Sequence, residues 1–418
     1  MRVYLESLGC RLNAAEVESL ARQIVGSGHE VVDDPTGADT IVLNSCAVTA
    51  QASRRSRRRL HTLHRQSPDA RIGVTGCWAT EDVSRAEGVE GVQWVLANAD
   101  KTQMAGAILG ATPAAPAPWL PGRWGHTRAF LGVQEGCDHA CTYCITRLLR
   151  GRARSRPLAD AVQQVQHFVA QGAQEVILTG ICLGSYGSDL DLGEEFPALV
   201  SAIMRDTDVP RLRLSSIELW DVTPKLLALW EDSRLCGQLH VPLQSGSDSV
   251  LKRMGRRGTV SALSALVRAA RDIRPDLAIT TDVITGFPGE TRRDFDQTVS
   301  LVEDLRFARL HVFPYSERAG TAATRLPGMV PMGVRRARAR QLRELGAWLA
   351  RAYREQFVGQ RLQVLWMGQG ADGAWQGLTD TYLKVRARSE RDLYNRITGA
   401  TITSAAGEAL VGDVVPCD

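Results

Sequence analysis

Cysteines are the residues of this chain whose spacing has the clearest chemical meaning. Cys137, Cys141 and Cys144 form a C-x3-C-x2-C pattern in the segment EGCDHACTYCITR, directly after the strand-like run FLGVQE. The next cysteine is Cys182, so the pattern supplies three thiolates rather than four. Three thiolates can hold three irons of a 4Fe-4S cluster and leave the fourth iron open, whereas four cysteines fill every position. The spacing therefore predicts a cluster whose open iron can bind a substrate.

A second set of three cysteines is scattered through the first part of the chain. Cys10 follows the apolar run VYLE, Cys46 follows TIVLN and Cys77 follows RIGVT. In a parallel α/β sheet the carboxyl ends of strands share one edge, so the three thiols should converge there. A glycine or serine precedes each one, which lets the backbone approach a cluster closely. We expect a second three-thiolate site; buried free cysteines are the alternative, since cysteine is commonly buried.

Alternating strand-like and helix-like segments predict an α/β protein of several domains. A chain of 418 residues exceeds the size of one ordinary core. Residues 1–110 indicate a parallel α/β domain, and the Ala- and Pro-rich stretch 111–122 is interpreted as a semi-stiff linker. Six further strand-and-helix units within 123–355 predict a partial (β/α)6 barrel, and short strands in 356–418 predict a small β-barrel.

The charge pattern favours a nucleic-acid partner, and the hydropathy pattern argues against a membrane. The formal net charge is only +4, but arginines recur in three clusters, at 54–59, 147–156 and 335–343. Such clusters can contact phosphates, although solvated helix faces have the same composition. Neither a long apolar run nor a signal peptide is evident, so we expect a cytoplasmic protein without a membrane partner. In a reducing compartment, nine cysteines are more often metal ligands or redox groups than disulfides.

The central cysteine segment resembles the radical S-adenosylmethionine superfamily, whose members carry this spacing with an aromatic residue before the last cysteine, here Tyr143. The resemblance implies that the open iron binds S-adenosylmethionine. Its reductive cleavage then gives methionine and a 5'-deoxyadenosyl radical, which can abstract hydrogen where no side chain can.

The same resemblance implies cofactor contacts at the carboxyl ends of the barrel strands. Gly180 would let the backbone approach the methionine part of the cofactor, while Ser216, Glu218 or Gln244 would hydrogen-bond its ribose or carboxylate. Ordinary turn chemistry is an equal alternative for the glycine. The other cysteines match no cluster motif and are interpreted as structural: Cys182, Cys236 and Cys417.

The resemblance extends over essentially the whole chain to one family, the methylthiotransferases. It is carried in order by GCRLNAAEVES, LNSCAVTAQASRRSRR, VTGCWA, LTGICLGSYG, LRLSSIE, HVPLQSGSDSVLKRMGR, TDVITGFPGET and FPYSERAGT. In that family three such N-terminal cysteines hold an auxiliary cluster, which implies two 4Fe-4S clusters here, the auxiliary one on Cys10, Cys46 and Cys77. The family often has Asn or Asp at the position of Cys182, which puts any cofactor contact from this residue in doubt.

The last domain resembles the small RNA-binding TRAM domain of RNA-modifying enzymes. RNA contacts are expected from basic residues of this domain and of the segment after the central cysteines: Arg152, Arg154, Lys384 and Arg386. The alternative is a stability domain whose aromatic residues form its core. We expect several of those aromatic residues to be buried in either case.

Among methylthiotransferases the segments TRAFLGVQEGCDHACTYC, RLRLSSIE and LHVFPYSERAGT most resemble the group that acts on threonylcarbamoyladenosine at position 37 of tRNA. The expected partners are a tRNA anticodon stem-loop, a reductase or flavodoxin-type electron donor, and a sulphur source. Isopentenyladenosine-37 in tRNA and an aspartate of ribosomal protein S12 are alternative substrates. From other classes, a two-cluster electron carrier or an RNA-binding module with structural zinc would leave the six barrel units unexplained.

Overall fold

The computed structural model describes residues 1–123, 126–190 and 195–415, so Cys417 lies outside the described residues. The chain forms two compact units. Unit 1 comprises Met1–Pro157, Thr179–Gly193 and Ser316–Thr324, and unit 2 comprises Leu158–Leu178, Glu194–Tyr315 and Arg325–Asp418. This division does not follow the domain boundaries expected at 110, 123 and 356, which stay predictions. Within the described ranges, no helix is both long and apolar enough to span a lipid bilayer.

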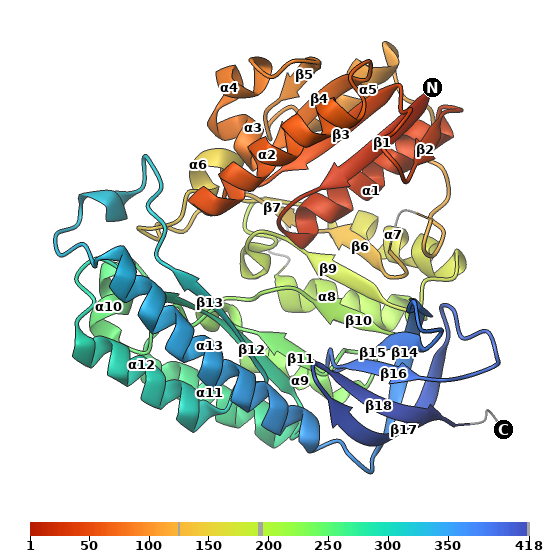
Figure 1. Cartoon of the computed structure of the whole chain (residues 1–418). Coiled ribbons are helices and arrows are strands. Elements are labelled where there is room, and N and C mark those ends of the chain that lie inside the picture. Colours follow the sequence, from red (N-terminus) through yellow and green to blue (C-terminus); the bar gives the residue numbers. More distant parts are fainter. Residues whose placement is uncertain (124–125, 191–194, 416–418) are drawn as a thin grey trace. The chain divides into compact units, whose positions relative to one another are not determined.

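Unit 1 is built on a five-stranded parallel sheet in the order β2-β1-β3-β4-β5 (Figure 1). The strands are β1 Arg2–Ser7, β2 Glu30–Val32, β3 Thr40–Ser45, β4 Arg71–Gly76 and β5 Val92–Leu96. The helices are α1 Arg11–Gly26, α2 Ala50–Gln66, α3 Cys77–Glu81, α4 Val83–Glu87 and α5 Met104–Leu109. The parallel α/β layer predicted for this part of the chain is confirmed.

Side-chain alternation along β3 explains why helices cover both faces of this sheet. Ile41 and Leu43 belong to an apolar cluster with residues of α2, α3 and α4. Val42 points the other way and packs with residues of α1 and α5. Successive strand residues face opposite sides, so a strand with three consecutive apolar residues, Ile41 to Leu43, must be buried on both.

The stretch 111–122, interpreted as a linker, is instead packed against α1. The Arg22 side chain donates to the Ala117 carbonyl at 2.8 Å, and the Ala117 N–H donates back to the Arg22 carbonyl at 2.9 Å. Trp119 is fully buried. The apolar residues of this segment follow neither a helical nor a strand periodicity. The segment is nevertheless ordered, because burial of Trp119 stabilises it.

A buried carboxyl group on α1 should make the stability of the protein depend on pH. Burial raises the pKa of Glu18 to about 8, and the charge of Arg22 lowers it only in part. The folded state therefore holds a proton that the unfolded state has lost, so stability falls as pH rises from about 4.5 to 8. We expect Glu18→Gln to flatten this loss in urea unfolding at several pH values. Exposed Glu30→Gln is the control, and an unchanged pH profile in Glu18→Gln would contradict the assignment.

The rest of unit 1 carries the central cysteines on a loop. Its elements are β6 Ala129–Gly132, β7 Gln134–Glu135, α6 Thr146–Arg150, β8 Arg154–Ser155 and the short helix η2 Leu183–Ser185. Strands β7 and β8 pair antiparallel, with Glu135 opposite Arg154. The cysteine loop is thus anchored by β7 before it and by α6 and β8 after it.

Unit 2 continues the strand and helix alternation predicted for the barrel. Its parallel strands are β9 Val176–Thr179, β10 Leu212–Leu214, β11 Gln238–His240, β12 Ala278–Thr285 and β13 Arg309–Pro314. Strand β9 pairs with β10, and β12 lies between β11 and β13. The helices are α7 Leu158–Ala170, α8 Phe196–Asp206, α9 Pro224–Ala228, α10 Asp248–Arg253, α11 Val260–Ile273, α12 Arg292–Leu305 and α13 Met332–Glu355. With β6, all six predicted strands are present.

The final residues form a closed five-stranded barrel, as predicted. Its strands are β14 Arg361–Gln369, β15 Trp375–Thr379, β16 Lys384–Ala387, β17 Ile397–Ala406 and β18 Ala409–Val414, in the order β14-β15-β16-β18-β17. Trp366 and Trp375 are buried in its core with Val385 and Ala387. The aromatic residues expected in the core are therefore core residues, while Lys384 and Arg386 alternate with the core positions and face solvent.

A buried ion pair connects this barrel to the rest of unit 2. Arg213 in β10 pairs with Glu175 at 2.7 Å, with both side chains fully buried. Its guanidinium also donates to the carbonyls of Thr379 and Asp380 beside the small barrel. The neighbouring Arg211 donates to the carbonyls of Gln363 and Leu378. These arginines fix the barrel through the backbone of its strands.

Candidate metal centres

The three scattered cysteines lie at the carboxyl ends of neighbouring parallel strands. Cys10 precedes α1 just after β1, Cys46 follows β3, and Cys77 is the first residue of α3 after β4. Strands β1, β3 and β4 are adjacent in the sheet. Asn13 accepts from both the Cys10 Sγ and Arg150, Arg150 donates to the Cys77 Sγ, and a Cβ on Gly9 would touch the Cys46 Sγ. The thiols therefore meet at one edge of the sheet, as their positions in the sequence predicted.

Glycine and serine residues make room for these thiols and hold their backbone. A Cβ added to Gly9, whose φ is +102°, would lie 2.7 Å from the Cys46 Sγ. One added to Gly76, at φ +90°, would lie 2.3 Å from Asn44 Oδ1. The Ser56 hydroxyl accepts from the Cys46 N–H at 3.0 Å and donates to the Cys46 carbonyl at 2.9 Å. The small residues in the sequence pattern are thus required by close packing around the thiols.

A buried arginine contacts this cysteine cluster. The Nε–H of Arg150 donates to the Cys77 Sγ at 3.4 Å, and its Nη1 lies 2.9 Å from carboxylate oxygens of both Glu16 and Glu135. Lys101 pairs with the same two glutamates. Burial alone would lower the pKa of Arg150, but the surrounding negative groups raise it above its usual value, so the guanidinium is a permanent cation beside the thiols.

Two asparagines complete the polar surroundings of the cluster. Asn13 Oδ1 accepts from Cys10 Sγ at 3.3 Å and from Arg150 Nη2 at 2.5 Å. Asn98 Nδ2 lies 3.7 Å from Cys77 Sγ and donates to the Leu149 carbonyl at 2.9 Å. Three soft thiolate donors with N–H groups and a cation directed at the sulphurs suit an iron–sulphur cluster, whose charge such contacts tune. The residues present fit the auxiliary cluster that the sequence predicted.

The second cysteine set lies on the loop between β7 and α6. The backbone N–H groups of His139 and Thr146 each lie 3.4 Å from a cysteine sulphur, that of Cys137 and that of Cys144. The Cys144 N–H donates to the Cys141 carbonyl at 3.1 Å, which closes a turn between the two. All three cysteines are half-buried. A partly exposed three-thiolate loop with N–H groups directed at its sulphurs fits a cluster with one open iron.

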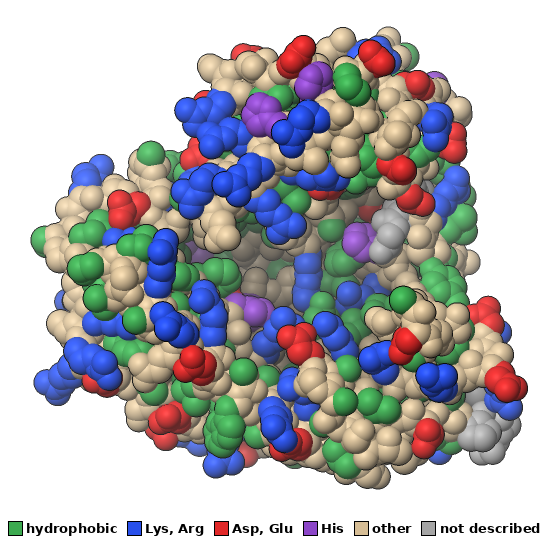
Figure 2. All heavy atoms as spheres, in the orientation of Figure 1, with side chains coloured by type: hydrophobic (Ala, Val, Ile, Leu, Met, Phe, Trp, Pro, Cys, Tyr) green, Lys and Arg blue, Asp and Glu red, His purple; other side chains and the backbone are tan. Residues whose placement is uncertain are grey.

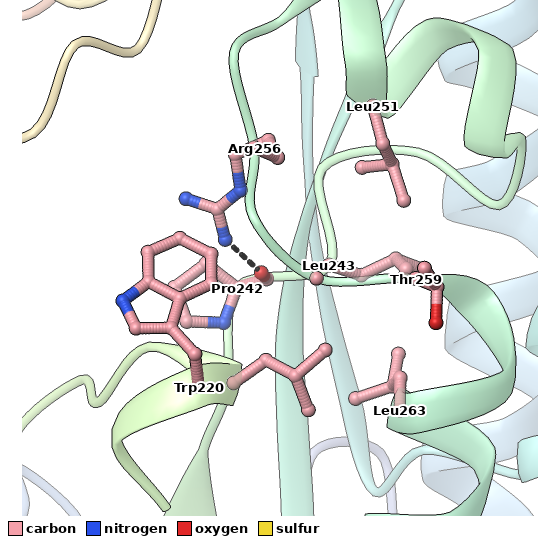
Figure 3. A pocket seen from close by; sticks show the side chains of 9 residues that line it. Trp220, Pro242, Leu243, Leu251, Arg256, Thr259 and Leu263 are labelled. Carbon is pink, nitrogen blue, oxygen red and sulfur yellow. Dashed lines mark hydrogen bonds between the residues drawn. The ribbon is translucent and has the colours of Figure 1, made fainter.

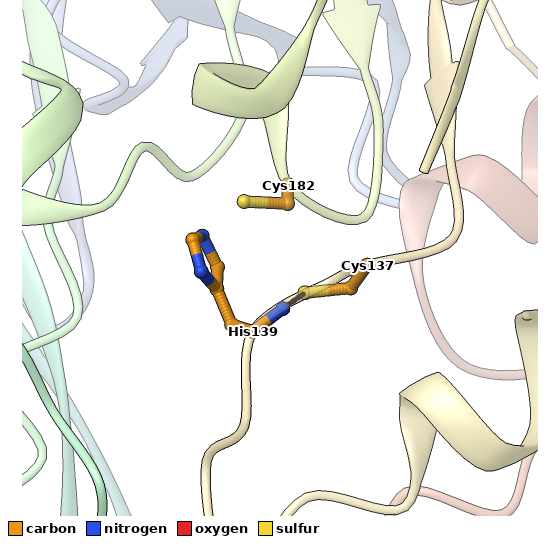
Figure 4. A group of neighbouring side chains, drawn as sticks. All are labelled: Cys137, His139 and Cys182. Carbon is orange, nitrogen blue, oxygen red and sulfur yellow. Dashed lines mark hydrogen bonds between the residues drawn. The ribbon is translucent and has the colours of Figure 1, made fainter. Parts of the chain in front are cut away.

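Cys182 lies next to this loop, although the sequence assigned it a structural role. Its Sγ and ligand atoms of Cys137 and His139 all lie within 4.8 Å of one another (Figure 4). Cys182 is buried, and its Sγ accepts a hydrogen bond from the Ser185 hydroxyl at 3.2 Å. A thiol with no assigned role thus lies beside the cluster loop.

Two predicted cofactor contacts, Gly180 and Tyr143, also belong to unit 1. A Cβ added to Gly180 would lie 2.9 Å from the Leu183 side chain and 3.0 Å from Gln134. Glycine is required here by packing, and the cofactor contact assigned to it stays a prediction. Tyr143 is half-buried between two cysteines of the loop.

In unit 2, Glu218 is already engaged by an arginine. Arg256 binds its carboxylate with both Nη atoms, at 2.8 and 2.5 Å, and donates to the Pro242 carbonyl at 2.7 Å. The guanidinium lies over the Trp220 ring, 4.8 Å from its centroid, beside a small apolar pocket (Figure 3). Each Glu218 oxygen thus accepts one hydrogen bond from Arg256 and has one lone pair left. The cofactor contact predicted for Glu218 would use these remaining lone pairs.

Gln244 and Ser216 are the other two residues of unit 2 predicted to contact the cofactor, and Gln244 has an unusual backbone conformation. Gln244 has φ +70°, a left-handed conformation that costs a non-glycine residue about 1–3 kcal/mol. Its N–H donates to the Asp282 carbonyl at 2.8 Å, and its carbonyl accepts from the Ile284 N–H at 2.9 Å. Strain held by neighbouring strands is common at functional sites. Ser216 is half-buried, and its role stays a prediction.

The residues expected to contact RNA are all exposed. Arg152 and Arg154 have 88% and 56% of their side chains exposed and pair with Asp138 and Glu135. Lys384 pairs with Glu408 at 3.6 Å, and Arg386 pairs with Asp372. The exposed pairs of Arg152, Lys384 and Arg386 contribute little, so phosphates can replace their acidic partners. Glu135, the partner of Arg154, is only 22% exposed and also pairs with Arg150 and Lys101.

The three arginine clusters have different roles in the structure. Arg54, Arg55 and Arg58 on α2 are exposed, and Figure 2 shows Lys and Arg side chains gathered over that helix. Arg150 of the second cluster is buried at the cysteines, and Arg335 of the third is buried against the carbonyls of Val330 and Tyr315. Sequence clustering therefore did not separate solvent-exposed arginines from buried ones.

Several functional candidates were missed in the sequence because their partners are distant in the chain. Arg150 and Cys77 are 73 positions apart, and Arg318 reaches Ser53 and Glu81 from more than 230 positions away. Two such residues could have been found in the sequence, because they lie inside motifs that carry the family resemblance. Asn13 belongs to GCRLNAAEVES and Arg318 to FPYSERAGT.

Known protein families match both segments of the chain that carry the two cysteine sets. Residues 2–96, with the first three cysteines, match the family described as Uncharacterized protein family UPF0004, and residues 131–302, with the next three, match the Radical SAM superfamily. The radical S-adenosylmethionine methyltransferase TsrM from Kitasatospora setae shares the fold, with a TM-score of 0.54 at 17% identity, covering 75% of this chain and 72% of that one.

Curated relatives match over nearly the full chain. The "Threonylcarbamoyladenosine tRNA methylthiotransferase MtaB" of Thermotoga maritima is 35% identical, covering 91% of this chain and 90% of the relative. The protein of the same name in Bacillus subtilis is 34% identical, covering 96% and 94%. The "tRNA-2-methylthio-N(6)-dimethylallyladenosine synthase" of Geobacter sulfurreducens is 32% identical, covering 99% and 97%. The chain therefore belongs to the radical S-adenosylmethionine methylthiotransferase family of these relatives.

Proposed function

We propose that the protein transfers a methylthio group to C2 of N6-threonylcarbamoyladenosine at position 37 of tRNA. The observation that carries this proposal is the 35% identity to a relative named for that activity over 91% of the chain. The two separate three-cysteine sites support it, because methylthio transfer needs both a radical generator and a sulphur-bearing site. We also propose that the reaction takes place in the cytoplasm.

Two 4Fe-4S clusters and S-adenosylmethionine supply, when bound, a 5'-deoxyadenosyl radical and a methylated sulphur. Cys137, Cys141 and Cys144 would hold the cluster that binds S-adenosylmethionine, and Cys10, Cys46 and Cys77 would hold the auxiliary cluster. Arg150 would place a fixed positive charge at the auxiliary site, where thiolates and sulphide accumulate negative charge. A radical is required because the C2–H bond of adenine is not activated for removal by a base.

The tRNA would be held through its backbone and presented through its anticodon loop. Position 37 lies in a loop, so its base can be turned out without opening a duplex. The proposed phosphate contacts are Arg152, Arg154, Lys384 and Arg386, since the side chain of each is exposed. A reductase or flavodoxin-type donor would supply electrons, and a separate donor would supply sulphur.

The phosphate contacts predict a change in salt dependence. Replacing Lys384 and Arg386 together by alanine should lower the slope of log Kd for a tRNA anticodon stem-loop against log salt by about 1.5, because each lost contact removes about 0.7–0.9. Filter binding at several salt concentrations measures this slope. Arg205→Ala, which removes an exposed arginine paired with Asp206, is the matched control. An unchanged slope in the double variant would exclude phosphate contact by this strand.

Nucleoside analysis in complemented bacteria tests the substrate. The gene is expressed in one strain that lacks the threonylcarbamoyladenosine methylthiotransferase and in another that lacks the isopentenyladenosine enzyme, and tRNA nucleosides are measured by mass spectrometry. We expect the 2-methylthio derivative of threonylcarbamoyladenosine to return in the first strain only. Return of 2-methylthio-isopentenyladenosine instead would favour the second candidate, which the Geobacter sulfurreducens relative supports. A variant without Cys137, Cys141 and Cys144 is the negative control.

A further inference from the structure

Two histidines and an aspartate converge on three neighbouring strands of unit 2. His240 lies in β11, Asp282 in β12 and His311 in β13, and β12 lies between the other two strands. Asp282 is directly opposite His311 in the register, and His240 is opposite Thr280, two residues before Asp282. Residues two apart in a strand point to the same face. The three side chains therefore share one face of this sheet.

The ligand atoms of this group are spaced as a metal ion requires. The Asp282 Oδ1 lies 3.4 Å from His240 Nε2 and 2.9 Å from His311 Nδ1, and all three atoms lie within 4.8 Å of one another. Ligands at about 2.0–2.1 Å from a tetrahedral zinc ion are about 3.3 Å apart. The observed distances therefore need only a small adjustment to enclose one ion.

A supporting hydrogen bond fixes the first histidine. His240 Nδ1 lies 2.8 Å from the Thr280 hydroxyl, which leaves Nε2 directed at Asp282. Metal-binding histidines commonly use their second ring nitrogen in this way. His311 Nδ1 lies 2.9 Å from the Asp282 Oδ1. The group thus offers a carboxylate and an oriented imidazole.

We propose that His240, Asp282 and His311 bind one divalent transition-metal cation of the zinc class. Two imidazoles and one carboxylate are a donor set that suits zinc and iron(II) rather than magnesium or calcium. The side chains are 12%, 27% and 39% exposed, so the ion keeps a coordination position open to a water or carboxylate oxygen. The site is additional to the iron–sulphur sites of the proposed function and does not depend on them.

Zinc binding to the iron-loaded, full-length protein tests the proposal. Equilibrium dialysis under anaerobic conditions, with zinc and iron counted by mass spectrometry, should find one zinc ion per chain beyond the iron. X-ray absorption at the zinc edge should show only N or O ligands near 2.0 Å, because zinc held by cysteines would add sulphur at about 2.3 Å.

His311→Asn is the informative variant. The asparagine amide can still donate to Asp282, so the fold is kept, but it cannot supply an imidazole ligand. We expect zinc affinity to fall by at least about tenfold in His311→Asn and in Asp282→Asn. His167→Ala, which removes an exposed histidine on α7, should bind as the wild type does. No zinc in the wild type, a sulphur shell around the zinc, or equal affinity in His311→Asn and wild type would each overturn the proposal.

Discussion

Replacing Cys10, Cys46 and Cys77 together by alanine is expected to halve the iron of the reconstituted protein and abolish methylthio transfer. If each three-thiolate site holds one 4Fe-4S cluster, as proposed, the count should fall from about eight irons to about four. Formation of 5'-deoxyadenosine should continue, because the cysteines proposed to bind the S-adenosylmethionine cluster lie on a different loop. Anaerobic reconstitution, iron and sulphide analysis and a cleavage assay measure these quantities.

The reciprocal variant makes this test decisive. Replacing Cys137, Cys141 and Cys144 should also leave about four irons, but 5'-deoxyadenosine formation should stop. Cys236→Ala is the control, because this buried thiol is far along the chain from both cysteine sets and lies beside Arg213 and Glu175. Burial raises the pKa of Cys236 to about 12, so it stays a neutral thiol. About four irons in both the wild type and the Cys10, Cys46, Cys77 variant would remove the auxiliary cluster, and with it the methylthiotransferase mechanism.

Replacing Arg150 by glutamine is expected to lower the free energy of unfolding by about 3 kcal/mol. Removing one partner of a buried ion pair costs about 3–5 kcal/mol because the other charge stays buried without compensation. Lys101 still pairs with Glu16 and Glu135, so the lower end of this range applies. Urea unfolding of the iron-free protein measures this loss without a contribution from the clusters.

The same substitution should also weaken the auxiliary cluster. Arg150 donates to Cys77 Sγ, and loss of this N–H and its charge leaves the thiolates less stabilised. Iron counting should therefore show partial loss in Arg150→Gln while 5'-deoxyadenosine formation is retained. Arg152→Gln, two residues away and exposed, should change stability by no more than about 0.5 kcal/mol. Equal stability of the two variants would show that the buried network around Arg150 is not stabilising.

Local patterns in the sequence were sufficient to predict the main elements and to single out six cysteines, whose assignment to clusters stays a prediction. The apolar runs VYLE, TIVLN and RIGVT are long enough and apolar enough to form buried parallel strands, and each ends at or just before a cysteine. Parallel strands must align their carboxyl ends, so the convergence of Cys10, Cys46 and Cys77 followed from local information alone. The loop spacing of Cys137, Cys141 and Cys144 is also local.

Only the tertiary structure decided which polar side chains serve the sites. An arginine in a basic cluster looks the same in sequence whether it faces solvent, like Arg152, or is buried against a thiol, like Arg150. The difference depends on Glu16 and Cys77, which lie far away in the chain. Likewise, the packing of 111–122 depends on its contacts with α1, and the meeting of His240, Asp282 and His311 depends on strand order and register. These are set by how the whole core is packed and not by any single segment.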